Sequence, residues 1–526
     1  MTATVMTGRE RIYTDRTTEE LERVDVVVEE LERTLDIHCK NAIEIAYLQE
    51  YYLGKHPEII NRVKTVRPDV DNKVTVDYAY STTRDIVGYF LGKSIRYVQR
   101  GTSASVPQGE TDESGDDERR TQVETLNHIF DIENKAEVDI QIATDCSVNG
   151  IGYRGVFPDM RARNGTHLSI RRLNPETTYV VWSSGDICDP MFAVSYWGNN
   201  VANDNLDEKR VYITVYTQTR QYLFETEFDI IANPQFMVTD PVLKETKAID
   251  FGGYLPIIEY QNNGYAIGDW EMALSIMDAI DVLASDGVND IQQFVENVLV
   301  AIGMEFDKST QETLNTVGVL NIPKLPQGMP FAPVLEYISP QLDPNSGIAM
   351  REFLESTFRV IVGVPDRKTR GGGGGDTGDA VYLRDGWQDI DLVAANKEAS
   401  FIKAEREALG TALRILSVND EISPDLKPSD VEIKFNRNKT SNIQSKAQVL
   451  QTLWKLLDPV DALEICDLTT NPQDVIIRAE KYAETRLQKQ LDEQERVSQV
   501  AAKFDKKNED VNTGSQNKSD NNSTED

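Results

Sequence analysis

The sequence predicts an α+β protein divided into several domains. Three observations support this: helical periodicity near both ends, short β-rich runs between about residues 137 and 260, and a proline-rich segment that separates two helices. The chain has 526 residues, 40% of them hydrophobic, which is enough for about three or four separate cores. We therefore expect most of the chain to be globular.

The N-terminal part predicts two helices. The first runs from about residue 18 to residue 52, where apolar residues recur at helical spacing behind an acidic start. Gly54 and Pro57 end this helix. The second runs from about 76 to 91, and the run SIRYV behind it alternates like a strand.

The pattern then changes from helical to polar and afterwards to β-rich. Residues 101–121 are rich in Gly, Ser, Asp and Glu, which predicts a solvated loop. Between about 137 and 260, short runs such as YVVW, FAVSYW and VYITVYTQ are separated by turn clusters. This alternation predicts an antiparallel β-rich domain.

Helical periodicity returns after the β-rich region. Apolar spacing predicts a long helix over about residues 269–302, with Gly287 as a candidate interruption. Residues 304–345 then contain six prolines. Prolines at this density exclude a helix and predict a small, stiff, extended module.

Two more helices are predicted behind this module. The first covers about residues 346–364, with Asn345 or Ser346 as its N-cap and Pro365 as its end. After a glycine-rich break, the next covers about residues 380–416.

The C-terminal part begins with the strand-like run VEIKFNRN. Residues 440–503 then follow a helical pattern. From about residue 505 the sequence is polar and without apolar periodicity, which predicts a disordered acidic tail.

The net charge of −32 disfavours tight wrapping of nucleic acid. Solubility is its simplest interpretation. The chain lacks an apolar run of about 18 residues and an apolar N-terminal leader, so we expect neither a membrane span nor secretion. The four cysteines lie far apart, which fits synthesis in a reducing cytoplasm with the thiols as small core residues.

The nearest match to a catalytic signature is Gly88–Ser94, GYFLGKS. A phosphate-binding loop needs four residues between its glycines and a helix behind it, whereas this run has three and a helix before it. We interpret it as a turn that ends a helix. The histidines are scattered singly, without the spacing of metal ligands.

Two acidic pairs, Asp69/Asp71 and Asp389/Asp391, have a spacing that can bind Mg²⁺. Such pairs arise by chance among 87 acidic residues, so we interpret them as solvated surface. The sequence thus predicts no catalytic residues, no metal site and no cofactor.

The glycine run is a candidate contact site for DNA. It consists of Gly371, Gly372, Gly373, Gly374 and Gly375. Arg367, Lys368 and Arg370 precede it, and Arg384 follows it. Such a loop suits transient, sequence-independent contacts with phosphates, and a plain flexible linker is the alternative interpretation.

Six segments resemble the portal proteins of long-tailed bacteriophages that infect Gram-positive hosts. They are Tyr51–Pro57, Asp77–Ala79, Gly88–Tyr97, Leu173–Trp182, Asn345–Met350 and Ile433–Asn438. The order of elements is also similar to that family over about residues 20–500. The chain departs from it in the glycine-rich stretch 371–387 and in the acidic insertion at 101–121.

The resemblance implies a ring of identical subunits, usually twelve, at one vertex of the capsid. Such a ring is the conduit for DNA packaging and ejection, and it is not an enzyme. The implied partners are other copies of the chain, the terminase large subunit, the major capsid and scaffolding proteins, the head–tail adaptor and, transiently, double-stranded DNA. The implied location is the virion, with assembly in the host cytoplasm and no membrane contact.

The resemblance also implies a division of the chain. It would comprise an N-terminal arm (1–19), a wing (20–265), a stem helix (266–302), a clip (303–345), a second stem helix (346–364), a tunnel loop (365–379), a long helix with a return strand of the wing (380–439), a crown (440–504) and the tail (505–526). In the clip, Lys324, Leu325, Gln327 and Met329 would dock the terminase. In the tunnel loop, the basic residues and the glycines would line the DNA channel.

Two alternatives remain at this point. One is a packaging-associated ATPase or nuclease, which requires a true phosphate loop or an acidic metal cluster. The other is a different structural protein of the head or baseplate, a class that rarely places a proline-rich module between two long helices.

Overall fold

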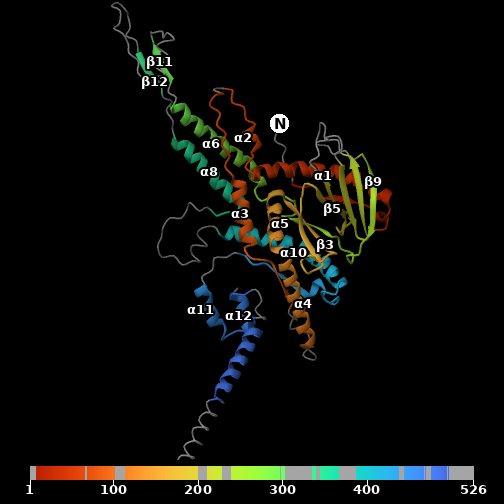
Figure 1. The fold of residues 1–526 in the computed structure, drawn as a ribbon. Helices are drawn as coiled ribbons and strands as arrows, with labels where there is room; N and C mark the ends of the chain where they lie inside the picture. Colours follow the sequence, from red (N-terminus) through yellow and green to blue (C-terminus); the bar gives the residue numbers. More distant parts are fainter. Residues whose placement is uncertain are drawn as a thin grey trace, which may run out of the picture. The chain divides into compact units, whose positions relative to one another are not determined.

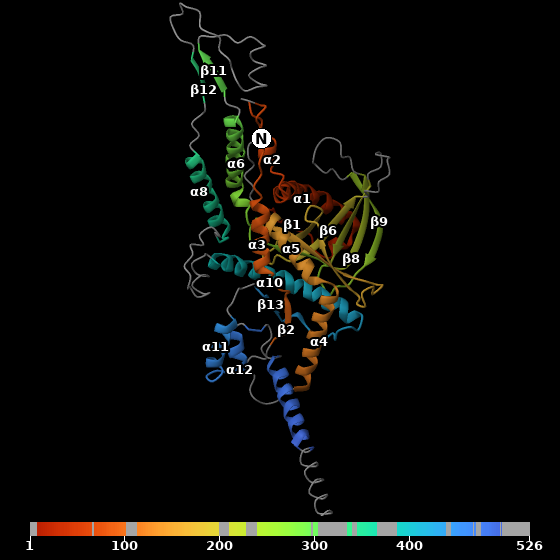
Figure 2. The ribbon, with the colours of Figure 1, turned by 60° about the vertical axis from the view of Figure 1, so that its left-hand side comes forward.

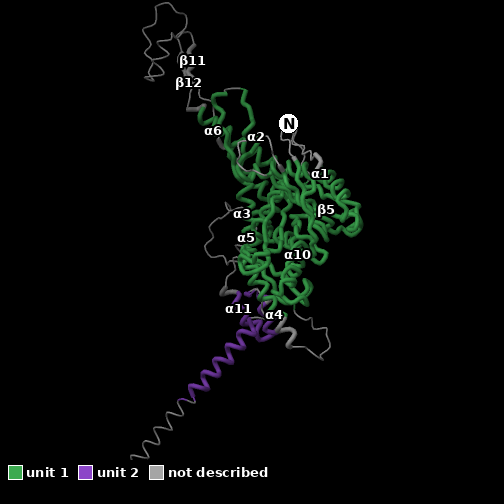
Figure 3. Tube along the Cα trace, turned by 45° about the vertical axis from the view of Figure 1, so that its right-hand side comes forward, with its two compact units in different colours: residues 1–439 green, residues 440–526 purple. Residues whose placement is uncertain are grey.

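The computed structural model describes residues 8–65, 68–100, 113–198, 210–227, 239–295, 298–302, 334–338, 344–365, 387–437, 443–466, 468–469, 475–494 and 496. Residues 1–439 form one compact unit and residues 440–526 form a second (Figure 3). None of the helices in these described ranges combines the length and hydrophobicity that a bilayer span requires. The fold class is mixed α+β, as predicted from the sequence.

A six-stranded sheet forms one layer of the first unit (Figures 1 and 2). Its order is β1 (Ile12–Thr14), β5 (Thr178–Ser183), β6 (Pro190–Gly198), β7 (Arg210–Thr217), β8 (Arg220–Glu227) and β9 (Thr239–Ala248). All neighbours are antiparallel except the parallel pair β1 and β5. The strands predicted from YVVW, FAVSYW and VYITVYTQ are confirmed.

A second sheet has the order β10 (Ile257–Gln261), β3 (Ile151–Pro158) and β4 (Leu168–Leu173). Side chains of both sheets share one buried cluster, which includes Val180, Trp182 and Ala193 from the first and Ile151, Tyr153 and Ile257 from the second. The β-rich region therefore begins at Ile151. The prediction of about residue 137 is too early, because α5 (Lys135–Asn149) precedes the first strand.

The helix α1 (Val24–Tyr52) follows a 3-10 turn, η1 (Glu20–Glu22), and confirms the predicted first helix. Its apolar stripe includes Val27, Leu31 and Leu35, which are buried with Val181 and Val194 of the six-stranded sheet. One helix thus covers this side of β5 and β6, and the amphipathic spacing of α1 specifies that contact.

His38 is a buried polar residue on α1. Its ring stacks on Tyr179 at 4.5 Å between centroids, and Nε2 lies 3.2 Å from the carbonyl oxygen of Glu176. Burial lowers the pKa of His38 to about 4, and the Glu176 carbonyl offsets this only in part. His38 is therefore neutral in the folded protein at neutral pH.

We expect His38 to make the first unit acid-labile. Between pH 6.5 and 4, the unfolded chain takes up a proton on this ring and the folded chain does not, so the free energy of unfolding falls by up to about 3 kcal/mol. In His38→Gln, whose amide still donates to Glu176, this loss is absent. Urea unfolding followed by tryptophan fluorescence across this pH range measures it. The exposed His128→Gln is the control, and an unchanged pH slope in His38→Gln would contradict the prediction.

A central layer joins parts of the unit that are distant in sequence. It contains α3 (Tyr78–Phe90), β2 (Arg96–Gln99), α4 (Glu113–Ile132), α5, α10 (Trp387–Val418) and β13 (Val431–Lys434), with η4 (Pro428–Asp430) as a short turn. The short helix α2 (Pro57–Ile60) lies between α1 and α3 in the chain and outside this layer. Strand β2 pairs antiparallel with β13. The predicted helices at 76–91 and 380–416 and both short strands are confirmed where they are described, from Trp387 onward in the case of α10.

The predicted solvated loop at 101–121 is wrong from residue 113 onward. Helix α4 begins at Glu113, and its residues Val123, Leu126 and Phe130 are buried in the main core at helical spacing. A sequence rich in Asp and Glu suits the N-terminal end of such a helix because carboxylates interact favourably with the helix dipole. Residues 101–112 lie outside the described part.

Four charged side chains meet in the middle of this layer. They are Glu405 of α10, Arg154 of β3, and Lys135 and Asp139 of α5. Arg154 Nη1 lies 3.0 and 2.8 Å from the two carboxylate oxygens of Glu405, and Lys135 Nζ lies 2.8 Å from Asp139. Burial alone would raise the pKa of Glu405, but the charges of Arg154 and Lys135 outweigh it and hold that pKa below its usual range.

Helix α6 (Leu274–Val295) follows η2 (Glu271–Ala273), and Gly287 does not interrupt it. The predicted continuation of this helix to residue 302 is wrong, because Val298–Ile302 is strand β11 and pairs antiparallel with β12 (Val334–Ile338). Val298, Val300 and Ile302 are β-branched and alternate, which favours a strand once a partner is present. The partner strand β12 is extended, as expected for the proline-rich segment, and residues 303–333 and 339–343 lie outside the described part.

Helix α8 (Pro344–Val362) confirms the helix predicted over about residues 346–364, with a different start and end. Pro344 takes the first helical position, which suits its fixed φ and missing N–H, so Asn345 and Ser346 lie inside the first turn instead of capping it. Gly363, at φ +71°, ends the helix two residues before Pro365.

The second unit is largely helical in its described residues, as predicted for 440–504. It contains α11 (Ile443–Leu453), α12 (Pro459–Cys466) and a helix over residues 475–494. Ala462, Leu463 and Cys466 of α12 are buried. Cys39 and Cys146 are also buried and Cys188 is partly so, in line with the prediction of thiols as core residues. The predicted tail, 505–526, lies outside the described part.

Candidate functional site

The predicted site residues lie outside the described part of the chain. This holds for Arg367, Lys368, Arg370, Gly371–Gly375 and Arg384 of the glycine-rich segment, and for Lys324, Leu325, Gln327 and Met329 of the proline-rich segment. The structure describes what flanks them. On one side are β11 and β12, and on the other are the end of α8 and the start of α10. The candidate site is therefore built from these flanks.

Helices α6 and α8 lie side by side (Figures 1 and 2). Because α6 leads into β11 and β12 leads into α8, the four elements form one helix–strand–strand–helix hairpin. Its base is held by buried polar contacts. Trp270 Nε1 donates to Thr83 Oγ1 at 3.0 Å, and Lys397 Nζ pairs with Asp269 at 2.8 Å.

Helix α8 has one buried face and one exposed apolar face. Phe358 and Val362 are buried, and Phe358 lies against Tyr78 with ring centroids 5.2 Å apart. The exposed stripe consists of Met350, Phe353, Val360 and Ile361, with exposed fractions of 53%, 64%, 78% and 50%. At 100° per residue, these four positions fall within a sector of about 100°. We call this surface the α8 stripe.

Both flanks of the glycine-rich segment are anchored at the start of α10. A side chain at Gly363 would stand 3.0 Å from Val393 Cγ2 and 3.8 Å from the carbonyl oxygen of Asp389. Arg359 Nη1 donates to the carbonyl oxygen of Pro365 at 3.3 Å, and Trp387 lies near the ring of Tyr89. The predicted basic residues are thus joined to the fold through two firmly packed ends that lie close together.

Comparison with known families identifies the protein that carries this hairpin. The family model described as "Phage portal protein, SPP1 Gp6-like" matches residues 31–499. The chain belongs to this family. No curated protein matches the chain.

Membership confirms the resemblance read from the sequence. This portal protein is a structural component of the phage virion at the capsid vertex, and the family implies a homo-oligomeric ring that associates with the capsid and serves as the conduit for DNA packaging and ejection. The family is not enzymatic, so the ATPase or nuclease alternative is wrong, and so is the baseplate alternative.

The residues that resembled a catalytic signature have structural roles in the portal protein. Gly88 lies in the last turn of α3, which ends at Phe90, and β2 begins at Arg96, so the segment is a helix-ending turn as predicted. Asp391 pairs with Arg437 at 2.6 Å. Within the described ranges, no three His, Cys, Asp or Glu side chains are grouped to hold a metal ion.

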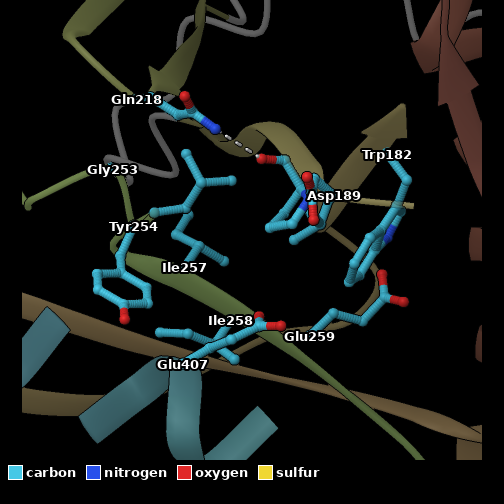
Figure 4. A pocket seen from close by; sticks show the side chains of 12 residues that line it. Trp182, Asp189, Gln218, Gly253, Tyr254, Ile257, Ile258, Glu259 and Glu407 are labelled. Atoms are coloured by element: carbon cyan, nitrogen blue, oxygen red, sulfur yellow. Dashed lines mark hydrogen bonds between the residues drawn. The ribbon is translucent and has the colours of Figure 1, made fainter. Parts of the chain in front are cut away.

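A cavity of about 280 Å³ lies between the two sheets and α10 (Figure 4). Its lining includes Trp182, Asp189, Tyr254, Ile257, Glu259 and Glu407. Burial raises the pKa of both Glu259 and Glu407. Arg11 and Lys403 lie over the Trp182 ring at 4.4 and 5.3 Å and bring positive charge close to these carboxylates. No local pattern in the sequence indicates this cavity, because its lining comes from separate strands and from α10.

Proposed function

We propose that the α6–α8 hairpin is the stem of the portal ring. The clip then comprises β11, β12 and the proline-rich residues between and behind them, so it begins at Val298 instead of residue 303. The wing is the remainder of the first unit, about residues 20–265 with α10 and β13, and the crown is the helical second unit, about residues 440–504. The hairpin, which links two long helices through a strand pair, supports this assignment.

The α8 stripe supports a subunit contact along the stem. Four large apolar side chains stay exposed on one face of a helix whose opposite face is buried. An apolar surface of this kind favours a protein partner over water, and a ring of identical subunits supplies another copy of the chain at every position. We propose that neighbouring stems meet at this stripe in a ring of twelve.

Residues 365–379 form the proposed tunnel loop, in which Arg367, Lys368 and Arg370 contact the DNA backbone with Gly371–Gly375 beside them. The packing of both flanks supports this assignment. Because the end of α8 and the start of α10 are held in place, the two ends of the basic segment start from defined positions. A net charge of −32 per subunit disfavours adhesion of DNA elsewhere and so permits sliding. Arg384 precedes the start of α10 by three residues in the sequence, and we assign it to the same contact.

The proposed partners follow from this arrangement. The clip, with Lys324, Leu325, Gln327 and Met329, docks the terminase large subunit during packaging and the head–tail adaptor afterwards. The wing faces the major capsid protein and, during assembly, the scaffolding protein. Double-stranded DNA is bound transiently and without sequence preference, since only backbone contacts are involved.

Replacing Arg367, Lys368 and Arg370 by Ala tests the DNA contact. We expect intact rings that package less DNA and lose packaged genomes several-fold more often, because three phosphate contacts per subunit are removed. Genome length and the fraction of filled particles are the measurements. The matched control is the triple variant of the exposed residues Arg161, Arg171 and Lys427. Normal packaging and retention of full-length genomes in the first variant would refute the contact.

A further inference from the structure

Residues 54–77 form a closed loop that lies along α6, and we call this segment the strap. It is described at residues 54–65 and 68–77. Its two ends meet, because Gly54, at φ +75°, approaches Asp77 so closely that a side chain there would stand 2.9 Å from Asp77 Oδ1. The strap leaves the core after α1 and returns to it at the start of α3.

The returning part of the strap is bonded to α6 by a regular ladder. Three backbone N–H groups donate to three side chains of the helix: Asn72 to Asn289 at 2.8 Å, Val74 to Ser285 at 2.9 Å and Val76 to Asp281 at 2.8 Å. The donors are two residues apart, about 6.6 Å in an extended chain, and the acceptors are four residues apart, about 6 Å along a helix. The strap therefore runs antiparallel to α6 and engages one side chain per turn.

The acceptors of the ladder are buried. Asp281, Ser285 and Asn289 have exposed fractions of 0%, 1% and 1%. Buried polar groups without partners are costly, so the strap supplies the donors that make a polar stripe on α6 tolerable. The strap and this stripe stabilise each other.

The ladder alone does not define one position of the helix. The sequence of α6 continues the acceptor series with Gln293, four residues after Asn289. Arg62, which pairs with Asp286 at 3.1 Å, likewise finds a carboxylate one turn further on, at Asp290. A shift of α6 by one turn would therefore leave each of these strap donors opposite a polar side chain.

Two other contacts do select the observed position. His56, which is fully buried, binds the second carboxylate oxygen of Asp281 through Nδ1, and its ring stacks on Tyr51 at 4.7 Å between centroids. Tyr51 Oη donates to Asp278 at 2.6 Å. One turn further along α6, these two partners are replaced by Ser285 and Val282, so the contact of His56 with a carboxylate and the tyrosine bond exist in one register only.

We propose that the strap locks the axial position of α6, with Asp281 as the positioning residue that selects the register and Ser285 and Asn289 as its supports. The proposal rests on the assignment of α6 to the stem of the ring. A shift of one turn would move the helix by about 5.4 Å along its axis. Strand β11 follows α6 directly, so the strap determines where the strand pair, and with it the clip, stands relative to the rest of the first unit.

Amide hydrogen exchange on isolated rings tests the lock itself. In Asp281→Ala, we expect the amide of Val76 to exchange about tenfold faster, because α6 is then free to move between the two registers and the ladder opens at each move. Asp281→Asn keeps an acceptor at this position and restores slow exchange. The control is Asp290→Ala, which removes an exposed carboxylate from the same helix and leaves the strap unchanged. If Asp281→Ala does not fold, Ser285→Ala carries the same test at Val74.

Particles assembled with the same variants test whether the strap positions the clip for packaging. We expect Asp281→Ala rings to form while most capsids stay empty, and Asp281→Asn to restore filling. Unchanged exchange at Val76 would overturn the lock, and normal filling by Asp281→Ala rings would overturn its positioning role. Because exchange is measured without DNA, failure of the lock is distinguishable from failure of the stem and tunnel assignment, which the Arg367, Lys368 and Arg370 variant tests.

Discussion

Phe353→Asp is expected to leave the portal protein as a folded monomer of 59.2 kDa in place of a ring of several hundred kilodaltons. Phe353 is 64% exposed in the single subunit and lies in the centre of the α8 stripe. Burial of a Phe side chain in a contact contributes about 1.5–3 kcal/mol, whereas burial of an unpaired carboxylate opposes the contact. The penalty recurs at every interface of the ring, so closure fails.

The measurement is light scattering after size-exclusion chromatography, with negative-stain images for ring symmetry. Phe353→Leu is the matched control, because it keeps an apolar side chain at the same position and should still form rings. Glu352→Gln, a neighbouring change outside the stripe, should do so too. Circular dichroism checks that Phe353→Asp is folded. Rings of normal size in Phe353→Asp would exclude the α8 stripe as a subunit contact.

Glu405→Ala is expected to cost about 3–5 kcal/mol in the free energy of unfolding, because it removes one partner from a buried ion cluster. The cluster is neutral as a whole, with Lys135 and Arg154 balanced by Asp139 and Glu405. Without Glu405, one buried positive charge has no counterion, and the hydroxyl of Tyr260, which donates to Glu405 at 2.7 Å, loses its acceptor.

Chemical denaturation followed by tryptophan fluorescence measures this change. Glu398→Ala is the control on the same helix, because Glu398 is only half-buried in its pair with Arg437 and should cost no more than about 1 kcal/mol. The loss of unfolding free energy in Glu405→Gln should lie between the losses in Glu405→Ala and Glu398→Ala. Gln keeps the shape of the side chain and one acceptor oxygen but has no charge. Equal stability of Glu405→Ala and Glu398→Ala would show that the cluster does not hold α10 in place.

The sequence predicted those elements whose signal is local. Helices α1, α3 and α8 have apolar residues at helical spacing, and the strands β5, β6 and β7 have β-branched and aromatic runs between turn clusters. The end of α6 was misjudged because Val298 and Ile302 are four residues apart, which fits a helix as well as a strand. Only pairing with β12, far along the chain, decides between them.

The contacts that organise the first unit had no local signal. Glu405 and Arg154 are ordinary charged residues in the sequence, and only the fold brings them together. The strap also lacks a local sequence signal, because its donors are backbone N–H groups and its acceptors are common polar residues of a helix. The predicted roles of Arg367, Lys368, Arg370 and the clip residues stay predictions, supported by the anchoring of their flanks.

The pairing of β2 with β13 has a consequence for biosynthesis. Translation proceeds at roughly 5–20 residues per second, so β13 leaves the ribosome tens of seconds after β2. Late in that interval the nascent chain carries α8 but still lacks α10, which contributes a large part of the main hydrophobic core. A subunit therefore becomes competent for assembly only when nearly all of its first unit has been translated, which delays ring building until late in the synthesis of each chain.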